Sequence, residues 1–244
     1  MVSKNQIKFI SSLRQKKYRE KHHLFVAEGT KVIDELYRAG LKFYEIFSVE
    51  KLSGIPEGMV TYISEAELKK ISGLKTPNNA LAIVHIMVVK DFKSKGITLV
   101  LDDVRDPGNL GTIIRLCDWF GVINLVCSPK TVDCYNAKVI QSTMGSIARV
   151  NVYYKEIAKF LDENKNTPVF GAFMNGKNVY TTQLPKEAIL IMGNEANGIS
   201  EMLEKMISNR ITIPQFGNLQ ETESLNVATA TAILLSEFHR TIEK

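Results

Sequence analysis

Short apolar runs alternate with segments of helical periodicity along the whole chain, which is the pattern of an α/β protein. In the second part of the sequence, runs typical of buried strands occupy residues 97–101, 122–127, 149–154, 169–173, 188–192 and 210–214. Helices are expected between or after them, at residues 112–120, 136–144, 155–164 and 225–239. Strands separated by short helices predict a parallel, doubly wound sheet in this part of the chain.

The first 90 residues carry a shorter version of the same alternation. Strands are expected at residues 24–27, 44–49, 59–63 and 81–89, helices at residues 4–14, 30–39 and 65–71, and a basic, exposed loop at residues 16–23. Such a length suits a small α/β domain. We therefore predict two domains, residues 1–90 and 97–244, joined by the polar linker 91–96.

The composition is that of a globular protein, with 45% hydrophobic and 23% charged residues in a chain of 244. No apolar run reaches the length of a membrane span, and the first residues lack the apolar core of a signal peptide. The three cysteines show no CxxC spacing, which suggests reduced thiols and a cytoplasmic protein. They also do not pair with the four histidines at metal-ligand spacing, so no metal site is expected.

Basic residues are concentrated at the start of the chain. The net charge is +5, and the first 21 residues alone contain seven basic residues and one acidic residue. A solvated helix face is one interpretation and a phosphate-contacting arm is the other, and the concentration of the charge favours the arm. The candidate RNA-binding residues are Lys4, Lys8, Arg14, Lys16, Lys17 and Arg19.

Candidate chemistry begins where the strand at residues 97–101 runs into a polar loop and a helix. Asn109 or Asp106 can cap this helix, and Gly111 allows close approach of a ligand to the backbone. Arg115 is expected within the first turn or two, where a cation opposes the helix dipole, so a purely structural role is disfavoured. The structural alternative is an ion pair with one of the neighbouring carboxylates, Asp102, Asp103 or Asp118.

Residues 188–232 contain two more candidate segments, each following a short apolar strand, as in the ligand crevices of open α/β sheets. The loop 193–198 lacks the Lys of a phosphate-binding Walker loop and the GxGxxG dinucleotide spacing. Its Glu195 suits a cationic or hydroxyl partner, while a helix-capping turn is an equally open interpretation. In the other segment, Ser224 is the default cap of the last helix, and Asn226 has no evident structural reason to be polar.

These three segments resemble the motifs of the SpoU/TrmH-type RNA ribose 2′-O-methyltransferases of the SPOUT superfamily. Residues 106–115 resemble the first motif, residues 193–198 the second, and residues 213–226 the third, in the family's order. Residues 1–90, chiefly through residues 25–29, look like the RNA substrate-binding domain, similar to a ribosomal-protein fold, that precedes many members.

The resemblance implies a trefoil knot in the C-terminal domain and a homodimer formed through that domain. It implies S-adenosylmethionine as methyl donor, held by backbone around Gly193, Ile213 and Leu225. The expected reaction is methylation of a ribose 2′-hydroxyl, most simply in 23S rRNA. The catalytic residues carried over from the motifs are Arg115, Asn109, Glu195, Ser224 and Asn226.

Alternative functions remain at this point. A tRNA ribose methyltransferase and a non-catalytic RNA-binding or ribosome-assembly factor would use the same fold. A nucleotide-dependent oxidoreductase is disfavoured because the glycine fingerprint is missing. The segment 215–223 is longer than the family pattern and contains two acidic residues, which would weaken phosphate binding beside it.

Overall fold

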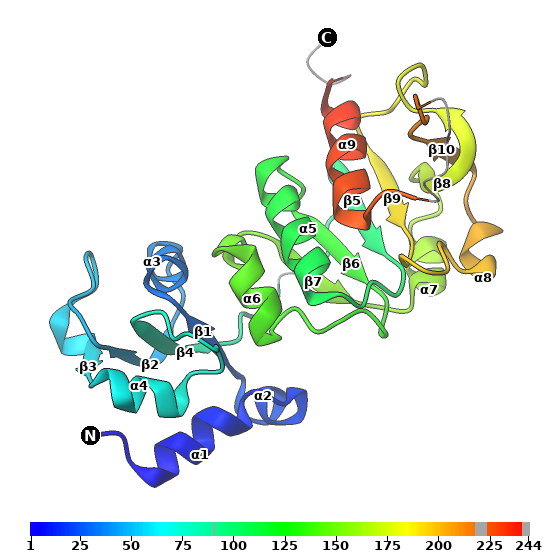
Figure 1. Ribbon diagram of the computed structural model, residues 1–244. Coiled ribbons are helices and arrows are strands. Elements are labelled where there is room, and N and C mark those ends of the chain that lie inside the picture. Colours follow the sequence, from blue (N-terminus) through cyan, green and yellow to red (C-terminus); the bar gives the residue numbers. More distant parts are fainter. Residues whose placement is uncertain (90, 218–223, 241–244) are drawn as a thin grey trace. The chain divides into compact units, whose positions relative to one another are not determined.

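The computed structural model describes residues 1–89, 91–217 and 224–240 (Figure 1). The chain forms two compact units, Met1–Val88 with Asp133–Arg149, and Val89–Val132 with Val150–Lys244. The sequence division into residues 1–90 and 97–244 therefore differs from the structure in one segment, because residues 133–149 pack with the first unit. No helix in the described ranges is both long and apolar enough to cross a membrane.

The first unit is built on a mixed four-stranded sheet with the strand order β1-β4-β2-β3. Its strands are β1 (Leu24–Glu28), β2 (Phe43–Ser48), β3 (Val60–Tyr62) and β4 (Ala80–His85). Strand β4 runs antiparallel to both β1 and β2, whereas β3 runs parallel to β2. The long apolar run predicted to be a strand over residues 81–89 pairs only as far as His85.

Helices of the first unit are α1 (Lys4–Ser12), α2 (Lys16–His22), α3 (Thr30–Arg38), α4 (Glu65–Ile71), α6 (Ala137–Thr143) and the short η1 (Glu57–Met59) and η2 (Ser146–Ala148). Helix α1 begins with a capping box, in which the Ser3 side chain accepts from the Gln6 amide. The prediction of a loop at residues 16–23 is wrong. These residues form α2, which ends where His23 adopts a left-handed conformation with φ 53°.

The segment 133–149 joins the first unit because its side chains find partners there. The ring of Tyr135 packs on Phe25 of β1, with ring centroids 4.9 Å apart. Burial, more than any other cause, raises the pKa of Tyr135 above its usual value. The Arg149 guanidinium forms an ion pair with Glu35 of α3 at 3.2 Å. The apolar spacing within residues 133–149 gives no information about these long-range partners, and the segment was therefore predicted to belong to the second domain.

The second unit contains a six-stranded sheet with the order β10-β8-β9-β5-β6-β7, and each described pairing is parallel. Its strands are β5 (Ile97–Leu101), β6 (Asn124–Cys127), β7 (Asn151–Tyr154), β8 (Val169–Asn178), β9 (Ala188–Met192) and β10 (Asn209–Thr212). The predicted parallel sheet is confirmed. Strands β5 and β9 are buried along their whole length, as expected for strands covered on both faces.

Helices cover both faces of this sheet (Figure 1). They are α5 (Pro107–Trp119), α7 (Ile157–Glu163), α8 (Glu201–Glu204) and α9 (Val227–Arg240), with α5 packed on α9 and α7 packed on α8. On the α7 and α8 side, alternate strand residues such as Val100 and Ile191 join Phe160 and Leu203 in one apolar cluster. The carboxyl ends of parallel strands meet at one edge of such a sheet, which is where a ligand crevice is expected.

Candidate active site

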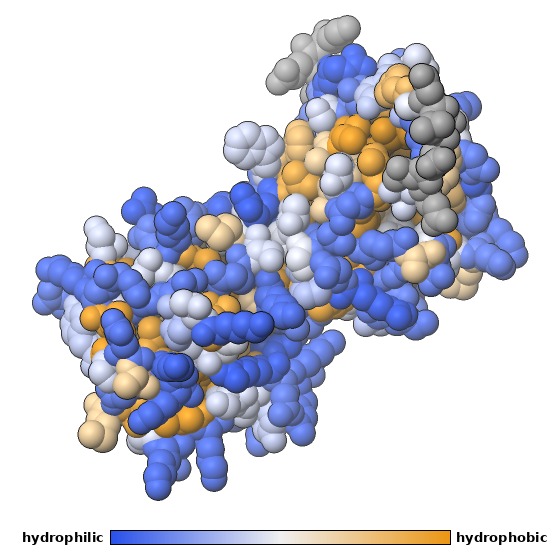
Figure 2. All heavy atoms as spheres, in the orientation of Figure 1, coloured by the Kyte–Doolittle hydropathy of each residue, from blue (hydrophilic) through white to orange (hydrophobic). Residues whose placement is uncertain are grey.

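A cavity of about 1370 Å³ lies in the second unit, where β9 and β10 end. Its wall includes the three residues expected to hold a cofactor, Gly193, Ile213 and Leu225, and the predicted site residues Glu195 and Ser224. Figure 2 shows apolar side chains open to this face of the unit beside α9. The structure therefore brings these five predicted residues, from two separate segments, to the wall of one cavity. The acidic loop residues 218–223 lie outside the described residues.

The charge of the cavity wall limits what it can bind. Its described residues include two carboxylates, Glu195 and Glu204, and no Lys, Arg or His. Glu204 is already paired with Arg210, so Glu195 is the acidic group of the wall without a cationic partner among the described residues. Such a wall suits a ligand with an apolar body and a positive charge. It does not suit a polyphosphate, which argues against a dinucleotide-dependent oxidoreductase.

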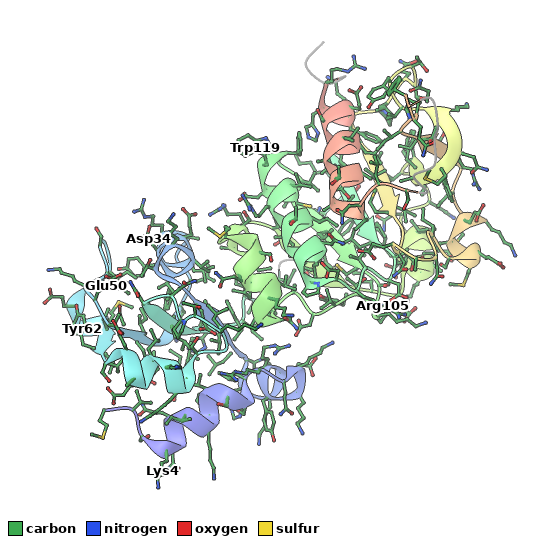
Figure 3. The ribbon with its side chains drawn as sticks, viewed as in Figure 1. Lys4, Asp34, Glu50, Tyr62, Arg105 and Trp119 are labelled. Carbon is green, nitrogen blue, oxygen red and sulfur yellow. The ribbon has the colours of Figure 1, made fainter. Side chains whose placement is uncertain are left out.

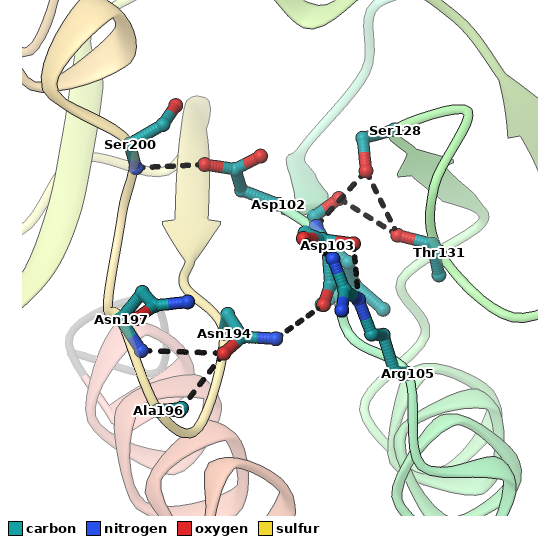
Figure 4. A network of polar contacts seen from close by, with 10 residues as sticks. Asp102, Asp103, Arg105, Ser128, Thr131, Asn194, Ala196, Asn197 and Ser200 are labelled. Atoms are coloured by element: carbon teal, nitrogen blue, oxygen red, sulfur yellow. Dashed lines mark hydrogen bonds and ion pairs between the residues drawn. The ribbon is translucent and has the colours of Figure 1, made fainter.

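The loop 193–198 is shaped by its glycines and by Asn194 (Figure 4). A Cβ at Gly193 would lie 2.2 Å from the carbonyl carbon of Gly198, so only glycine fits there. The Asn194 Oδ1 accepts from the amides of Ala196 and Asn197 at 2.8 and 3.2 Å. This Asx turn leaves the Glu195 side chain exposed on the cavity wall.

Two aspartates at the end of β5 brace the same loop. The Asn194 Nδ2 donates to the Asp103 carbonyl at 2.6 Å, and the Ser200 amide donates to the buried Asp102 carboxylate at 2.8 Å. The role of Asn194 was not predicted, although Asn is a typical first residue of an Asx turn, because its side chain can accept from an amide two residues further on. Asp102 and Asp103 were expected only as partners for Arg115, and they have other partners.

The last helix, α9, is capped by Asn226 and not by Ser224. The Asn226 Oδ1 accepts from the amides of Ala228 and Thr229 at 3.0 and 3.3 Å, and its carbonyl accepts from Ala230. Asn226 is therefore the cap of α9, which corrects the expectation that it has no structural role. The exposed Ser224 stands before the cap and lines the cavity.

Three predicted site residues from three different segments are joined by hydrogen bonds. Because α9 amides occupy its Oδ1, Asn226 must present its Nδ2, which donates to the Asn109 Oδ1 at 2.9 Å. Asn109 then presents its own Nδ2, which donates to the Glu195 carboxylate at 2.6 Å. A carboxylate can only accept, so the helix cap fixes the orientation of both amides. The geometry thus links Glu195 on the cavity wall to the ends of α5 and α9.

Helix α5 starts five residues earlier than predicted, with Asp106 as its cap, Pro107 at its first position, and the Asn109 amide donating to the Asp106 carboxylate at 2.8 Å. Arg115 is therefore the ninth residue of α5 and lies beyond the first turns, so the helix-dipole argument does not apply to it. Arg115 is exposed, and in the described part of the chain it has no hydrogen-bond or ion-pair partner. It does not belong to the cavity wall or to the amide network.

The basic residues of the first unit divide into two groups. Lys4, Lys8, Lys16 and Lys17 are exposed, and Figure 3 shows Lys4 projecting from α1. The Arg14 guanidinium donates to the carbonyls of Ile71 and Ser72, at 3.2 and 2.7 Å, while the residue stays exposed.

Arg19 is a correction to the predicted RNA-contacting arm. It is 3% exposed, and its guanidinium binds Asp133 and the carbonyls of Leu13 and Arg14. With these partners inside the unit, Arg19 is not available to a phosphate.

These features define a class of protein: an α/β domain with a cofactor-sized cavity at its strand ends, joined in one chain to a smaller α/β unit with exposed lysines. Residues 96–236 match the SpoU rRNA Methylase family, and residues 4–82 match the MRM3-like substrate binding domain. The chain belongs to the SpoU rRNA methylase family.

Similarity to individual proteins extends over the whole chain. The sequence is 32% identical to the 23S rRNA (guanosine(2553)-2′-O)-methyltransferase RlmP of Bacillus subtilis, over 96% of each chain. A solved TrmH-family structure from Porphyromonas gingivalis is 37% identical, with a TM-score of 0.87, and the match covers 98% of this chain and 99% of that one. An AdoMet-bound rRNA methyltransferase from Sinorhizobium meliloti is 28% identical, with a TM-score of 0.85 and coverage of 98% and 97%.

Proposed function

We propose that the protein transfers a methyl group from S-adenosylmethionine to a ribose 2′-hydroxyl of ribosomal RNA, most simply 23S rRNA. The observation that carries this proposal is the chain of hydrogen bonds from Asn226 through Asn109 to Glu195, which ends on the wall of the cavity. Membership of the SpoU family and similarity to a 23S rRNA methyltransferase over nearly the full length support the same reaction.

The cavity fits the proposed methyl donor. Its backbone at Gly193, Ile213 and Leu225 would hold the adenosine part, and the carboxylate of Glu195 would favour the positive charge. When bound, the cofactor supplies an electrophilic methyl group on a sulfonium. The absence of cationic side chains among the described wall residues is consistent with a cationic ligand.

The protein's own task is to position a weak nucleophile and to manage its proton. Glu195 has one oxygen held by Asn109, and we infer that its other oxygen orients the ribose hydroxyl by accepting its hydrogen bond. Ser224, exposed on the cavity wall, would orient the same hydroxyl or the Arg115 side chain. Fixed donors and acceptors need no rearrangement during the reaction, which is the main source of such catalysis.

Arg115 would bind the phosphate beside the target ribose and stabilise the developing alkoxide. Its guanidinium stays protonated at neutral pH, so it suits charge stabilisation better than proton abstraction. Support for this role is that Arg115 is exposed, has no partner among the described residues, and lies on the same helix as Asn109. Along the axis of α5, the positions of Asn109 and Arg115 are roughly 9 Å apart. The substrate would have to span this distance to contact both.

RNA would be gathered by the first unit through its exposed lysines, Lys4, Lys8, Lys16 and Lys17. The match of residues 4–82 to a substrate binding domain supports this division of labour, with residues 91–96 as linker. We further propose a ribosomal-protein-like first domain, a trefoil knot in the second, a homodimer formed through the second, and a cytoplasmic location. Family membership supports the knot and the dimer, and three buried cysteines, none of them in a disulfide, suit a reducing compartment.

One experiment tests the reaction: the pure protein is incubated with tritiated S-adenosylmethionine and total RNA, and the label is mapped. Transfer to a ribose 2′-oxygen of 23S rRNA is expected. Label in tRNA would show that the substrate is tRNA and would leave the proposed reaction unchanged. Cofactor binding without any transfer would indicate a non-catalytic RNA-binding factor, and no cofactor binding would refute the assignment of the cavity.

A further inference from the structure

The loop between β5 and α5 has the sequence Asp-Asp-Val-Arg-Asp over residues 102–106. Three carboxylates in so short a segment would be expected to repel the phosphates of RNA. In the structure each of these carboxylates has a partner in the protein. Asp102 accepts from the Ser200 amide, Asp106 accepts from the Asn109 amide, and Asp103 binds Arg105. Asp102 is buried and Asp103 is paired with Arg105, so of these three carboxylates Asp106 alone is exposed, and the loop presents the Arg105 guanidinium beside it.

Arg105 is held in a bidentate geometry. Its Nε donates to the Asp103 Oδ1 at 3.0 Å and its Nη2 to the Oδ2 at 2.7 Å. The arginine side chain is 66% exposed, against 20% for the aspartate, and Figure 3 shows Arg105 at the surface of the second unit. Two of the five N–H donors of a guanidinium are used in this way, so three remain for another acceptor. The bonds to Asp103 also raise the pKa of Arg105, whose guanidinium is protonated at neutral pH in any case.

The anchor of this arginine is itself fixed on several sides (Figure 4). Asp103 has φ +61°, a left-handed conformation that is uncommon for a residue with a side chain. Its amide donates to the Ser128 Oγ at 2.9 Å, and its carbonyl accepts from the Asn194 Nδ2 at 2.6 Å. Strained residues held by several partners concentrate at functional sites. Arg105 is thereby tied to the loop that carries Glu195.

We propose that Arg105 is an RNA-binding residue, which Asp103 holds ready to bind a phosphate of the substrate strand beside the Asn109–Glu195 site. The proposal rests on the proposed function, since it names a further contact of the same substrate. Arg105 lies four residues before Asn109, on the loop that leads into α5. A planar guanidinium with free donors is well suited to a phosphate, and prior anchoring reduces the entropy cost of binding.

The simpler interpretation is a surface ion pair with no function, and the chain offers a matched control for it. Arg240, at the end of α9 in the same unit, is also exposed and binds Glu237 through its Nε at 2.8 Å and its Nη2 at 2.7 Å. It is a comparable Arg–carboxylate pair that lies outside the strand-end loops. Both of its contacts go to one oxygen, the Glu237 Oε2, and Arg240→Ala therefore removes the same charge and a comparable exposed Arg–carboxylate pair.

The test compares Arg105→Ala, Arg105→Lys, Asp103→Asn and Arg240→Ala in the full-length protein. Binding of in vitro transcribed 23S rRNA is measured over a range of KCl concentrations, and methyl transfer, cofactor affinity and sedimentation are measured in parallel. Arg105→Ala should weaken RNA binding and lower kcat/KM for RNA about tenfold. It should also reduce the slope of log affinity against log salt concentration by about one, the change expected for the loss of one phosphate contact. Arg105→Lys and Asp103→Asn should fall between Arg105→Ala and the wild type, because each keeps one part of the clamp.

Cofactor affinity and the sedimentation coefficient should not change in Arg105→Ala, and Arg240→Ala should behave as wild type. Equal RNA affinity and salt slope in Arg105→Ala and wild type would overturn the proposal. So would a loss of self-association in place of RNA affinity, because it would place Arg105 in a protein interface. If the wild type transfers no methyl group at all, the proposed reaction fails, while the RNA-binding series still decides the role of Arg105.

Discussion

Two arginines, one in each unit, show how differently the same residue type is used. Arg19 on α2 is buried and binds Asp133 and two carbonyl groups. Arg115 on α5 is exposed and has no partner among the described residues. In the sequence Arg19 stood in a dense basic segment, which suggested an RNA contact, whereas Arg115 was expected to be catalytic, with an ion pair to a neighbouring aspartate as the structural alternative.

This difference shows that partners far away in the sequence decide whether a charged side chain is bound within the fold or left exposed. Asp133 is 114 residues from Arg19 and belongs to the segment that packs with the first unit. The aspartates near Arg115 are engaged elsewhere, since Asp102 binds the Ser200 amide and Asp103 binds Arg105. One guanidinium is thus engaged by the fold, whereas the other has no hydrogen-bond or ion-pair partner among the described residues.

The largest effect is expected from Arg19→Ala. Removing one partner of a buried pair leaves the Asp133 carboxylate without its cation, which costs about 3–5 kcal/mol of folding free energy. Denaturant unfolding followed by fluorescence would measure this loss, and Lys17→Ala, an exposed neighbour on α2, is the control.

Because the site lies in the second unit, cofactor affinity under native conditions should not change in Arg19→Ala. If this variant does not fold, Asp133→Asn offers a milder change with the same expected direction. An Arg19→Ala protein as stable as the wild type but weaker in RNA binding would restore Arg19 to the basic arm.

Arg115→Ala should give the opposite result, with a large effect on activity and almost none on stability. Loss of a charge stabiliser in the transition state lowers kcat by about 10²–10³-fold, or about 3–4 kcal/mol. Single-turnover methyl transfer measures this effect, with the melting temperature and cofactor affinity as controls. Arg115→Lys keeps the charge and should recover part of the rate. Near wild-type methylation by Arg115→Ala would refute its role both as base and as charge stabiliser.

The fold was largely predictable, because apolar periodicity is a local signal. The strand at residues 97–101 and the helix at residues 65–71 were predicted with the bounds of β5 and α4. The errors lie where long-range contacts decide. Helix α2 is held through Arg19 by Asp133, and residues 133–149 pack with the first unit. The apolar periodicity of the sequence gives no information about either of these contacts.

The site was predictable in its residue types but not in its connections. Asn109, Glu195 and Asn226 were named from the sequence, and the structure joins them by hydrogen bonds. Asn226 caps α9 and thereby orients the other two side chains through contacts between three segments that lie far apart in the sequence. The same holds for the brace from Asn194 to Asp103.

Asn226 combines the two roles that Arg19 and Arg115 keep apart, so it offers an intermediate test. Asn226→Asp retains the cap, because a carboxylate oxygen accepts from the α9 amides, but it removes the donor to Asn109. We expect wild-type stability and a kcat reduced by about tenfold, from the loss of one fixed hydrogen bond.

Asn226→Ala should lose both roles, with about 1 kcal/mol less stability from the missing cap. Thermal unfolding and methyl transfer measured on both variants separate the cap from the network. Equal activity in Asn226→Asp and wild type would show that the amide network is only structural.

The smallest effect per residue is expected from the lysines of the first unit. Replacing Lys4, Lys8, Lys16 and Lys17 by Gln should weaken RNA binding at low salt, because a protein that neutralises fewer phosphates releases fewer counterions from the RNA. The slope of log affinity against log salt should flatten by up to about four, and folding stability should not change because all four side chains are exposed.

A matched control replaces four exposed lysines of the second unit, Lys159, Lys165, Lys186 and Lys205. It removes the same net charge, and it includes an i,i+4 pair, Lys159 with Glu163, like that of Lys16 with Glu20. If both sets flatten the slope equally, RNA responds only to total charge. If only the first set does so, its lysines contact phosphate, and the basic arm acts without Arg19, which the fold has already engaged.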